Sequence, residues 1–262
     1  MKIIFKFLPI IKTIIKICMF IIFIYVFKQL IIQANDLFLK IFYGVFGTII
    51  LIGMLFYEYL KYIYEKMIIA LTINCNYQQY NQLKNKLIKL DIFKGFKPSL
   101  IISDTLYYID QKDGTKVLEI LKDNETFYRG HLDYLLIYHH SLFSAYCLLN
   151  NRTQMKHSYD SLNKLRSTNQ RKRKKVMKLL YNWDEIDGQA QLFIHRDPKK
   201  ALTFFNKVNI KKLNPRERVL LLAKKLLSYR QLNNYQQILL LTKEIESYSP
   251  NSPYIVGDNY EK

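Results

Sequence analysis

Residues that form tight turns are scarce in this chain of 262 residues, which holds only 8 glycines and 6 prolines. A β fold with many hairpins needs more of both, because glycine and proline set the backbone angles of short turns. Isoleucine, lysine, leucine, asparagine and tyrosine are abundant instead. This composition favours long helices, so we expect an all-α fold.

Cysteines are also few, and the three that occur are Cys18, Cys75 and Cys147. An odd number at wide spacing does not match the even, closely spaced set of a disulfide framework. We therefore interpret them as buried thiols in a reducing compartment.

Sequence motifs for catalysis are missing as well. The chain contains no GxxxxGK[ST], GxGxxG, GxSxG or CxxC motif, so phosphate cradles, activated nucleophiles and structural zinc lack support. The only histidine cluster combines His131, His139 and His140 with Asp133, without the spacing of a metal site. Asp184, Glu185 and Asp187 lie on different faces of an expected helix, which favours surface ion pairs. We expect no catalytic residue, no metal and no cofactor.

Long apolar runs are present near the start of the chain. Ile41 to Tyr57 contains no acid, base or proline, and with residues 37–39 it reaches the ~30 Å of a hydrocarbon core. A shorter run, Ile17 to Phe27, needs residues 13–15 and 30–32 to span a membrane. A polar turn at residues 33–36 separates the two runs. The pattern predicts a membrane anchor over residues 1–57, with transmembrane helices at about 13–32 and 37–57.

The distribution of lysines predicts how these two helices face. Two lysines, Lys28 and Lys40, lie near the turn, whereas six lie on the side of the termini. These six are Lys2, Lys6, Lys12, Lys16, Lys61 and Lys66. By the positive-inside rule, both termini face the cytoplasm and the protein is a multi-pass protein of the cell membrane. The rival interpretation is a signal peptide cleaved after Ala34, but Ile32 is bulky where a small residue is needed.

Glycines in the second run indicate how its two helices pack. Gly44, Gly47 and Gly53 offer no side chain to hold another helix away, although they do not form a GxxxG motif. We expect them to let the first helix approach the second.

Acidic residues are outnumbered, with 21 against 40 lysines and arginines, for a net charge of +19. Eight basic and three acidic residues give +5 for residues 1–66, and the remainder of the chain carries +14. For a domain held at a bilayer, this charge suggests attraction to anionic head groups, about 1 kcal/mol per basic residue near the surface. Nucleic acid is the second interpretation, and it is disfavoured because no helix-turn-helix, zinc or RNA-binding signature accompanies the charge.

A helix start recurs five times after the apolar runs. Each begins with Asn or Asp, continues with polar residues and then reaches an apolar one; the first residues are Asn76, Asp113, Asn151, Asp197 and Asn234. Such residues cap helices by accepting a backbone N–H of the first turn. The starts lie 37, 38, 46 and 37 residues apart, a period typical of helical-repeat arrays. Longer apolar segments between them predict partner helices at Pro98–Gln111, Phe127–Asn150, Lys175–His195 and Pro215–Leu232.

In these helix starts the chain resembles the tetratricopeptide repeat family. The resemblance is most direct in Asn234-Tyr235-Gln236-Gln237-Ile238 and Asp197-Pro198-Lys199-Lys200-Ala201. It extends to prolines after the second helices and to small residues in the first helices. These are Pro98, Pro215 and Pro250, and Ala145, Gly188 and Ala223. The resemblance implies an α-solenoid of about five helix pairs over residues 58–250, whose concave groove binds a protein or peptide without catalysis.

Three further features of the sequence allow a prediction: a basic run, the single tryptophan and the last twelve residues. The basic run Arg171, Lys172, Arg173, Lys174 and Lys175 either contacts anionic lipid or an acidic partner, or forms a solvated loop. Trp183, the only tryptophan, is expected in the core more than at a binding site. Residues 251–262 lack periodicity, and we expect a mobile C-terminal tail.

Together these patterns predict a membrane-anchored cytoplasmic adaptor or scaffold that binds a protein or peptide partner through a helical-repeat surface. The alternative is a membrane-bound peptide sensor or immunity-type protein, and an enzyme with an unrecognised site is a weaker third. We expect no nucleic-acid partner. The sequence leaves the oligomeric state and the tyrosines that line the groove open.

Overall fold

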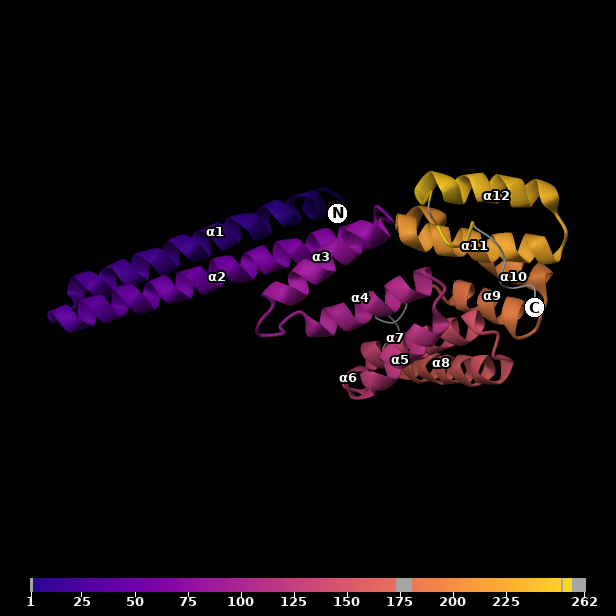
Figure 1. The fold of residues 1–262 in the computed structure, drawn as a ribbon, viewed down its shortest axis with the longest axis horizontal. Helices are drawn as coiled ribbons and strands as arrows, with labels where there is room; N and C mark the ends of the chain where they lie inside the picture. The colour runs from indigo at the N-terminus through magenta and orange to yellow at the C-terminus, as the bar shows by residue number, and fades with distance from the viewer. Residues whose placement is uncertain (1, 173–180, 251, 256–262) are drawn as a thin grey trace. The chain divides into compact units, whose positions relative to one another are not determined.

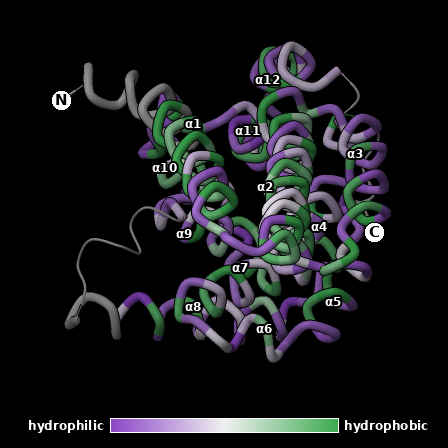
Figure 2. Tube along the Cα trace, turned by 90° about the vertical axis from the view of Figure 1, so that its left-hand side faces the viewer, coloured by the Kyte–Doolittle hydropathy of each residue, from purple (hydrophilic) through white to green (hydrophobic). Residues whose placement is uncertain are grey.

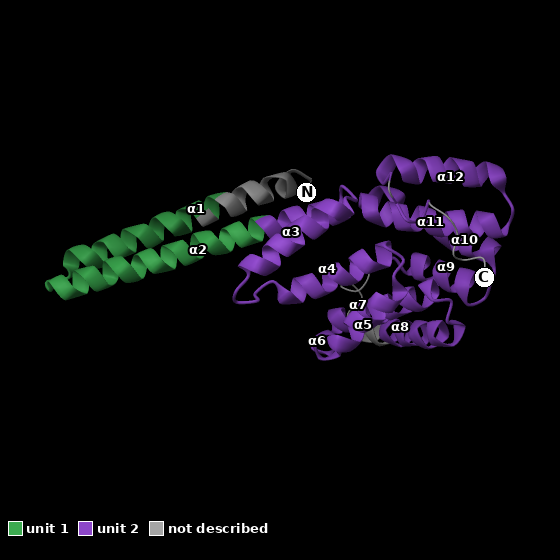
Figure 3. Ribbon diagram, viewed as in Figure 1, with its two compact units in different colours: residues 1–62 green, residues 63–262 purple. Residues whose placement is uncertain are grey.

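The structure is a computed structural model that describes residues 2–172, 181–250 and 252–255. Within these residues every regular element is helical and none is a strand, which confirms the all-α prediction (Figure 1). The chain divides into two compact units, residues 1–62 and residues 63–262 (Figure 3). The sequence places the boundary at residue 57, five residues before this division.

Unit 1 contains two long helices joined by a short turn. Helix α1 spans Lys2–Gln33 and helix α2 begins at Leu37, ending at Thr72 in unit 2. Among the described residues, α2 is the one helix long and apolar enough to cross a membrane, while the apolar stretch of α1, Ile17–Gln33, is shorter. Large apolar side chains on both helices face outward, for example Ile24, Phe38 and Ile52.

One of the three glycines of α2 brings the two helices together. The ring of Phe27 lies so close to Gly47 that a Cβ atom there would be 2.5 Å from it. Gly44 and Gly53 have no atom within 4 Å of the same position. Close approach of α1 is therefore confirmed at Gly47 alone.

Unit 2 begins with the last residues of α2 and continues through ten α-helices and one 3-10 helix in its described part. They are α3 (Tyr77–Leu90), α4 (Lys97–Asp110), α5 (Gly114–Asp123), α6 (Glu125–Arg129), α7 (Leu132–Leu148), α8 (Arg152–Lys172), α9 (Trp183–Phe193), α10 (Pro198–Phe205), η1 (Ile210–Lys212), α11 (Pro215–Gln231) and α12 (Tyr235–Tyr248). Hydrophobic and hydrophilic residues share helices such as α3 and α12, as expected of helices with one buried face (Figure 2).

The five predicted helix starts are confirmed. Each Asn or Asp side chain accepts the backbone N–H three residues later, at 2.9–3.2 Å; the acceptors are Asn76, Asp113, Asn151, Asp197 and Asn234. They begin α3, α5, α8, α10 and α12, the second helices of successive pairs. Local chemistry therefore sets where each second helix begins.

The residue before each of these caps has a left-handed backbone. The positive φ values belong to Cys75 (47°), Lys112 (58°), Asn150 (52°), Arg196 (55°) and Asn233 (54°). A left-handed residue ends one helix, and the cap that follows starts the next, so the chain reverses within a few residues. Glycine is the usual residue for this conformation. None of these five turns has glycine at the left-handed position, so the positions of glycine in the sequence do not reveal them.

Helices of a pair pack closely, as do some neighbouring pairs. Consecutive partners in contact are α4 with α5, α7 with α8, α9 with α10, and α11 with α12. At Gly188 in α9, an added Cβ would lie 2.6 Å from the Phe205 ring of α10 and 3.2 Å from the Ala201 carbonyl oxygen. Gly114 at the start of α5 makes a similar approach to the Ala145 carbonyl of α7.

Two of the four predicted partner helices need correction. Pro98–Gln111 and Pro215–Leu232 match α4 and α11 within a residue or two. Phe127–Asn150 is divided at Gly130 and His131 into α6 and α7, because the backbone of His131, at the N-cap position of α7, is extended. In the described part of Lys175–His195 the helix is Trp183–Phe193, because Asn182 is extended and its side chain caps a helix that begins at Trp183; residues 175–180 lie outside the described residues.

The first and last helices of unit 2 meet. Cys75, between α2 and α3, packs in one buried cluster with Val219 and Leu222 of α11 and with Leu241 and Ile245 of α12. Unit 2 is therefore closed by contacts between segments about 150 residues apart in the sequence.

The predicted mobile tail begins too early. Ser252 is buried, and the Tyr254 hydroxyl donates to the Ile109 carbonyl oxygen at 2.9 Å. Residues 252–255 are thus held against α4. The rest of the predicted tail, residues 251 and 256–262, lies outside the described residues.

Glycine at position 188 is expected to be required by packing. We predict that Gly188→Ala lowers the free energy of unfolding by about 1–3 kcal/mol, because Phe205 and the α10 backbone leave no room for a methyl group. Chemical denaturation of the full chain in detergent, followed by circular dichroism, measures the change. The matched control is Gly95→Ala, whose nearest atom would lie at 3.8 Å. Equal effects at the two positions would contradict the packing argument.

Candidate functional site

A cavity of about 760 Å³ lies inside unit 2. Its walls come from the first helices of the pairs: α4, α7, α9 and α11. Among the described side chains of the second helices, only Arg166 of α8 reaches it, and the remaining lining residues belong to η1, to loops between helices and to Tyr254. This volume falls within the ~300–1,000 Å³ range of ligand pockets.

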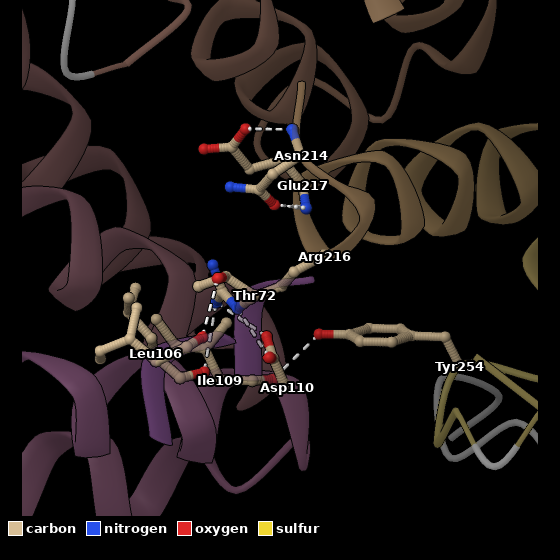
Figure 4. Close-up of polar contacts among 9 residues, drawn as sticks. Thr72, Leu106, Ile109, Asp110, Asn214, Arg216, Glu217 and Tyr254 are labelled. Atoms are coloured by element: carbon tan, nitrogen blue, oxygen red, sulfur yellow. Dashed lines mark hydrogen bonds and ion pairs between the residues drawn. The ribbon is translucent and has the colours of Figure 1, made fainter. Parts of the chain in front are cut away.

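A buried ion pair forms part of the cavity wall. Nε and one terminal nitrogen of Arg216, at the start of α11, donate to the two carboxylate oxygens of Asp110 at 2.7 and 2.8 Å. The same guanidinium donates to the Leu106 carbonyl oxygen at 3.2 Å. Figure 4 shows this group between α4 and α11, with Tyr254 approaching the same end of α4. Arg216 is 8% exposed and Asp110 is 1% exposed.

Each partner keeps the other charged. Burial by itself lowers the pKa of the Arg216 guanidinium, but the Asp110 carboxylate more than offsets this and holds that pKa above its usual value. Burial raises the pKa of Asp110, while the guanidinium, which stays protonated, stabilises the carboxylate form. The site needs both residues, because either one alone would be a buried and uncompensated charge.

The residues around Arg216 fix its position at the N-terminus of α11. Pro215 occupies the first turn, and Asn214 and Glu217 form a capping box, each side chain accepting the backbone N–H of the other at 2.9 Å. This box fixes the first turn of the helix, which carries Arg216 between its two members. Figure 4 labels Asn214, Arg216 and Glu217 of this turn.

Basic side chains outnumber acidic ones in the lining by seven to three. The basic residues are Lys112, Arg166, Lys207, Lys212, Arg216, Lys224 and Arg230, and the acidic ones are Asp184, Glu185 and Glu217. Three of the cations have carboxylate partners: Arg166 with Asp187, Arg216 with Asp110, and Lys224 with Glu185. Because Asp187 and Asp110 lie outside the lining, the cavity and its ion-pair partners together carry a net charge of about +2.

Lys207 and Lys212 supply charge at the exposed side. Both are exposed and follow α10, and neither forms an ion pair with a residue that the structure describes. Lys207 lies over the Phe204 ring, with its ammonium nitrogen 4.7 Å from the ring centre. These two lysines are placed to attract an anionic group into the cavity.

Aromatic groups form another part of the lining. His140 stacks on Tyr181 with ring centres 3.9 Å apart, and the Arg166 guanidinium lies 4.9 Å from the centre of Trp183. Burial, aided by Lys224 and Arg216, lowers the pKa of His140 to about 3, so the imidazole is neutral at pH 7. Trp183 lines the cavity and also packs against the buried cluster that contains Phe143 and Ile186, in agreement with the core position that the sequence favours.

The other residues singled out in the sequence do not converge. His131 and Asp133 are exposed at the start of α7, while His140 faces the cavity. Asp187 bonds to Tyr159 and Arg166, and Glu185 pairs with Lys224. Within the described residues no three His, Cys, Asp or Glu side chains are placed to hold a metal ion. Burial raises the pKa of Cys147, which lines the cavity, to about 12, so its thiol is protonated.

The predicted basic contact is outside what the structure shows. Arg173, Lys174 and Lys175 lie beyond the described residues, and Arg171 and Lys172 end α8 without described side chains. The cavity, in contrast, is missing from the sequence predictions. Its residues come from positions 106 to 254, and no spacing in the sequence joins them.

Removing one member of the buried pair is expected to destabilise unit 2. We predict that Arg216→Met lowers the free energy of unfolding by about 3–5 kcal/mol at pH 7, since Asp110 stays buried without a partner. The unpaired carboxyl then has a folded-state pKa above its unfolded value, so the folded state binds more protons. The loss should therefore shrink as the pH falls toward about 4. Denaturation curves of the full chain at several pH values measure this.

Lys224→Met is the matched control, because it breaks a partly exposed pair on the same helix. Its cost should be about 1 kcal/mol and nearly independent of pH between about 5 and 7. The double variant Asp110→Leu with Arg216→Met should be more stable than Arg216→Met alone. A double variant no more stable than the single one would show that the buried charge is not the cause.

Comparisons of the chain with protein-family models, with curated proteins and with solved structures find no match. The resemblance to tetratricopeptide repeats therefore stays a prediction, based on the capped helix starts. The cavity offers a partly apolar wall and an excess of basic side chains to a ligand. Among the described residues it contains no assembled nucleophile and no metal cluster.

Proposed function

We propose that this chain is a membrane-anchored adaptor whose helical-repeat domain binds a peptide, or an extended segment of a partner protein, in the cavity of unit 2. The observation that carries the proposal is the origin of the cavity wall: the first helices of consecutive pairs line it, as they line the concave groove of an α-solenoid. The five capped turns support a tetratricopeptide-like array of five helix pairs.

The lining indicates what kind of segment fits. Apolar side chains such as Leu220 and Leu227 favour apolar groups of a ligand, while the excess of lysine and arginine favours carboxylates. Tyr181 and Trp183 add rigid aromatic surface with polar tips, which is common at binding sites. An acidic peptide with apolar side chains satisfies all three.

The alternative is a membrane-bound peptide sensor, and one observation favours it. Arg216 lines the cavity and also closes unit 2 through Asp110. A ligand carboxylate that competes for Arg216 would loosen the contact between α4 and α11 and so report its own binding. An adaptor needs no such change, and the two functions differ in whether Arg216 keeps its partner when a ligand binds.

The membrane anchor is the second part of the proposal. A core helix of a soluble protein buries its apolar residues, whereas those of α1 and α2 face outward in unit 1. Lipid is the solvent that suits them. We propose that α1 and α2 both cross the membrane as a pair, with the termini and unit 2 in the cytoplasm, as the lysine distribution predicts.

Membrane integration is expected to resist salt and alkali. We predict that detergent, but neither high salt nor carbonate, releases the chain from isolated membranes. In a Cys18→Ser background, Asn35→Cys should react with a membrane-impermeant maleimide added outside intact cells, whereas Asn233→Cys should react only after permeabilisation. Reaction at Asn233→Cys in intact cells would contradict the orientation, and release by carbonate would contradict the anchor.

Peptide binding in the cavity is tested by photocrosslinking in intact cells. We predict that benzoylphenylalanine at position 220, in the wall of the cavity, captures a partner that is not captured from position 239, an exposed site on α12. Lys207→Glu with Lys212→Glu should lower the yield at position 220 by at least about thirtyfold, because each lost lysine charge contributes roughly 1 kcal/mol to the attraction of an acidic ligand. Equal capture from both positions would exclude the cavity as the binding site.

A further inference from the structure

The loop between α3 and α4 exposes two large apolar side chains in succession. Ile92 is 76% exposed and Phe93 is 90% exposed. Single apolar residues on a surface are ordinary, but an adjacent pair at the tip of a loop places more than 200 Å² or so of apolar surface in water. Such a tip suits an apolar partner surface.

The backbone of this loop is fixed, so the exposure belongs to a defined turn. The buried Asp91 carboxylate accepts the backbone N–H groups of Gly95 and Phe96 at 3.0 and 2.8 Å. The Lys94 N–H donates to the Asp91 carbonyl oxygen at 3.0 Å, and Lys94 has a φ of 55°. These bonds hold the loop in shape while Ile92 and Phe93 point away from the core.

Cations surround the apolar tip. Lys89 ends α3, Lys94 lies in the loop and Lys97 begins α4, and all three are exposed. The only acidic residue from position 84 to 103 is Asp91, which is buried and bonded to the backbone. An apolar pair flanked by exposed lysines is complementary to a bilayer surface with anionic head groups.

The loop lies at the end of unit 2 where that unit's part of α2 begins. Phe96 packs against Tyr64 of α2, with ring centres 5.4 Å apart. Tyr64 follows Tyr57, the end of the predicted span, by seven residues of the same helix, or about 10 Å of rise. The tyrosines between them, Tyr59 and Tyr62, are exposed, as residues in an interfacial aromatic belt are.

We propose that the α3–α4 loop is a second membrane contact, in which Ile92 and Phe93 enter the head-group region and Lys89, Lys94 and Lys97 contact anionic lipids. This inference rests on the proposed anchor and is independent of peptide binding in the cavity. A loop with two apolar side chains binds a bilayer weakly by itself, but the proposed anchor tethers it to the membrane, so its effective concentration there is high. The contact would fix the face that unit 2 turns toward the bilayer.

Spin-label accessibility in proteoliposomes tests the insertion. The full chain with Cys18→Ser carries a nitroxide at Phe93→Cys, and Cys75 and Cys147 are buried and do not compete for the label. In vesicles of phosphatidylcholine and phosphatidylglycerol, the label should collide more often with oxygen than with a water-soluble nickel complex. Leu239→Cys on α12 is the matched control, since Leu239 is an exposed apolar residue in the same unit, and its label should favour the nickel complex.

The lysines are tested in the same assay. Lys94→Gln should lower the ratio of inserted to exposed label about fivefold, and so should vesicles of lower phosphatidylglycerol content, because each basic residue near an anionic surface contributes roughly 1 kcal/mol. Lys243→Gln on α12 should change nothing.

The outcomes separate this inference from the proposed function. If carbonate strips the chain from the vesicles, the membrane anchor is wrong and the loop contact falls with it. If the chain stays in the membrane and the label at position 93 favours the nickel complex, the anchor stands and the loop contact is overturned. Insertion that is insensitive to phosphatidylglycerol would overturn the role given to the lysines.

Discussion

The buried pair of Arg216 and Asp110 is the constraint on which the rest of unit 2 depends. It joins residues 106 positions apart and places a charge at the wall of the cavity. Such pairs contribute little net stability compared with apolar residues of equal size, because removing two charges from water is costly. The pair links the end of α4 to the start of α11, because either residue without the other would be a buried and uncompensated charge. Tyr254 reinforces the same end of α4 by donating to Ile109.

Unit 2 is held together by local turns and by contacts between segments far apart in the sequence. The five turns, each a left-handed residue followed by an Asn or Asp cap, set the direction of every second helix without help from distant segments. Close packing at Gly188 and Gly114 then fixes how neighbouring helices approach. The contacts of Cys75 and Arg216 join segments of unit 2 that lie far apart in the sequence. The cavity is the space that the first helices enclose.

The sequence predicts the local part of this structure and misses the distant part. Asn76 and Asp197 signal helix starts because capping involves only the next three residues. The turns themselves are hidden, because lysine, cysteine and arginine occupy the left-handed position at Lys112, Cys75 and Arg196, where glycine is usual. The break before α7 is missed because apolar residues lie on both sides of Gly130 and His131, and the start of α9 is missed because the apolar pattern of the sequence continues upstream of Trp183. The cavity is missed because no periodicity relates residues on four separate helices.

Closure through the far end of the chain has a consequence for biosynthesis. Asp110 leaves the ribosome more than a hundred residues before Arg216, and Ile109 waits longer still for Tyr254. Until those residues emerge, the Asp110 carboxylate at the end of α4 has no guanidinium partner, and the Ile109 carbonyl oxygen has no bond from Tyr254. The nascent domain is thus incomplete while the apolar helices of unit 1 have already left the ribosome. Translation of α11 and of the residues after it completes the domain, so a chain that stops short of α11 lacks both the cation for Asp110 and the hydroxyl for Ile109.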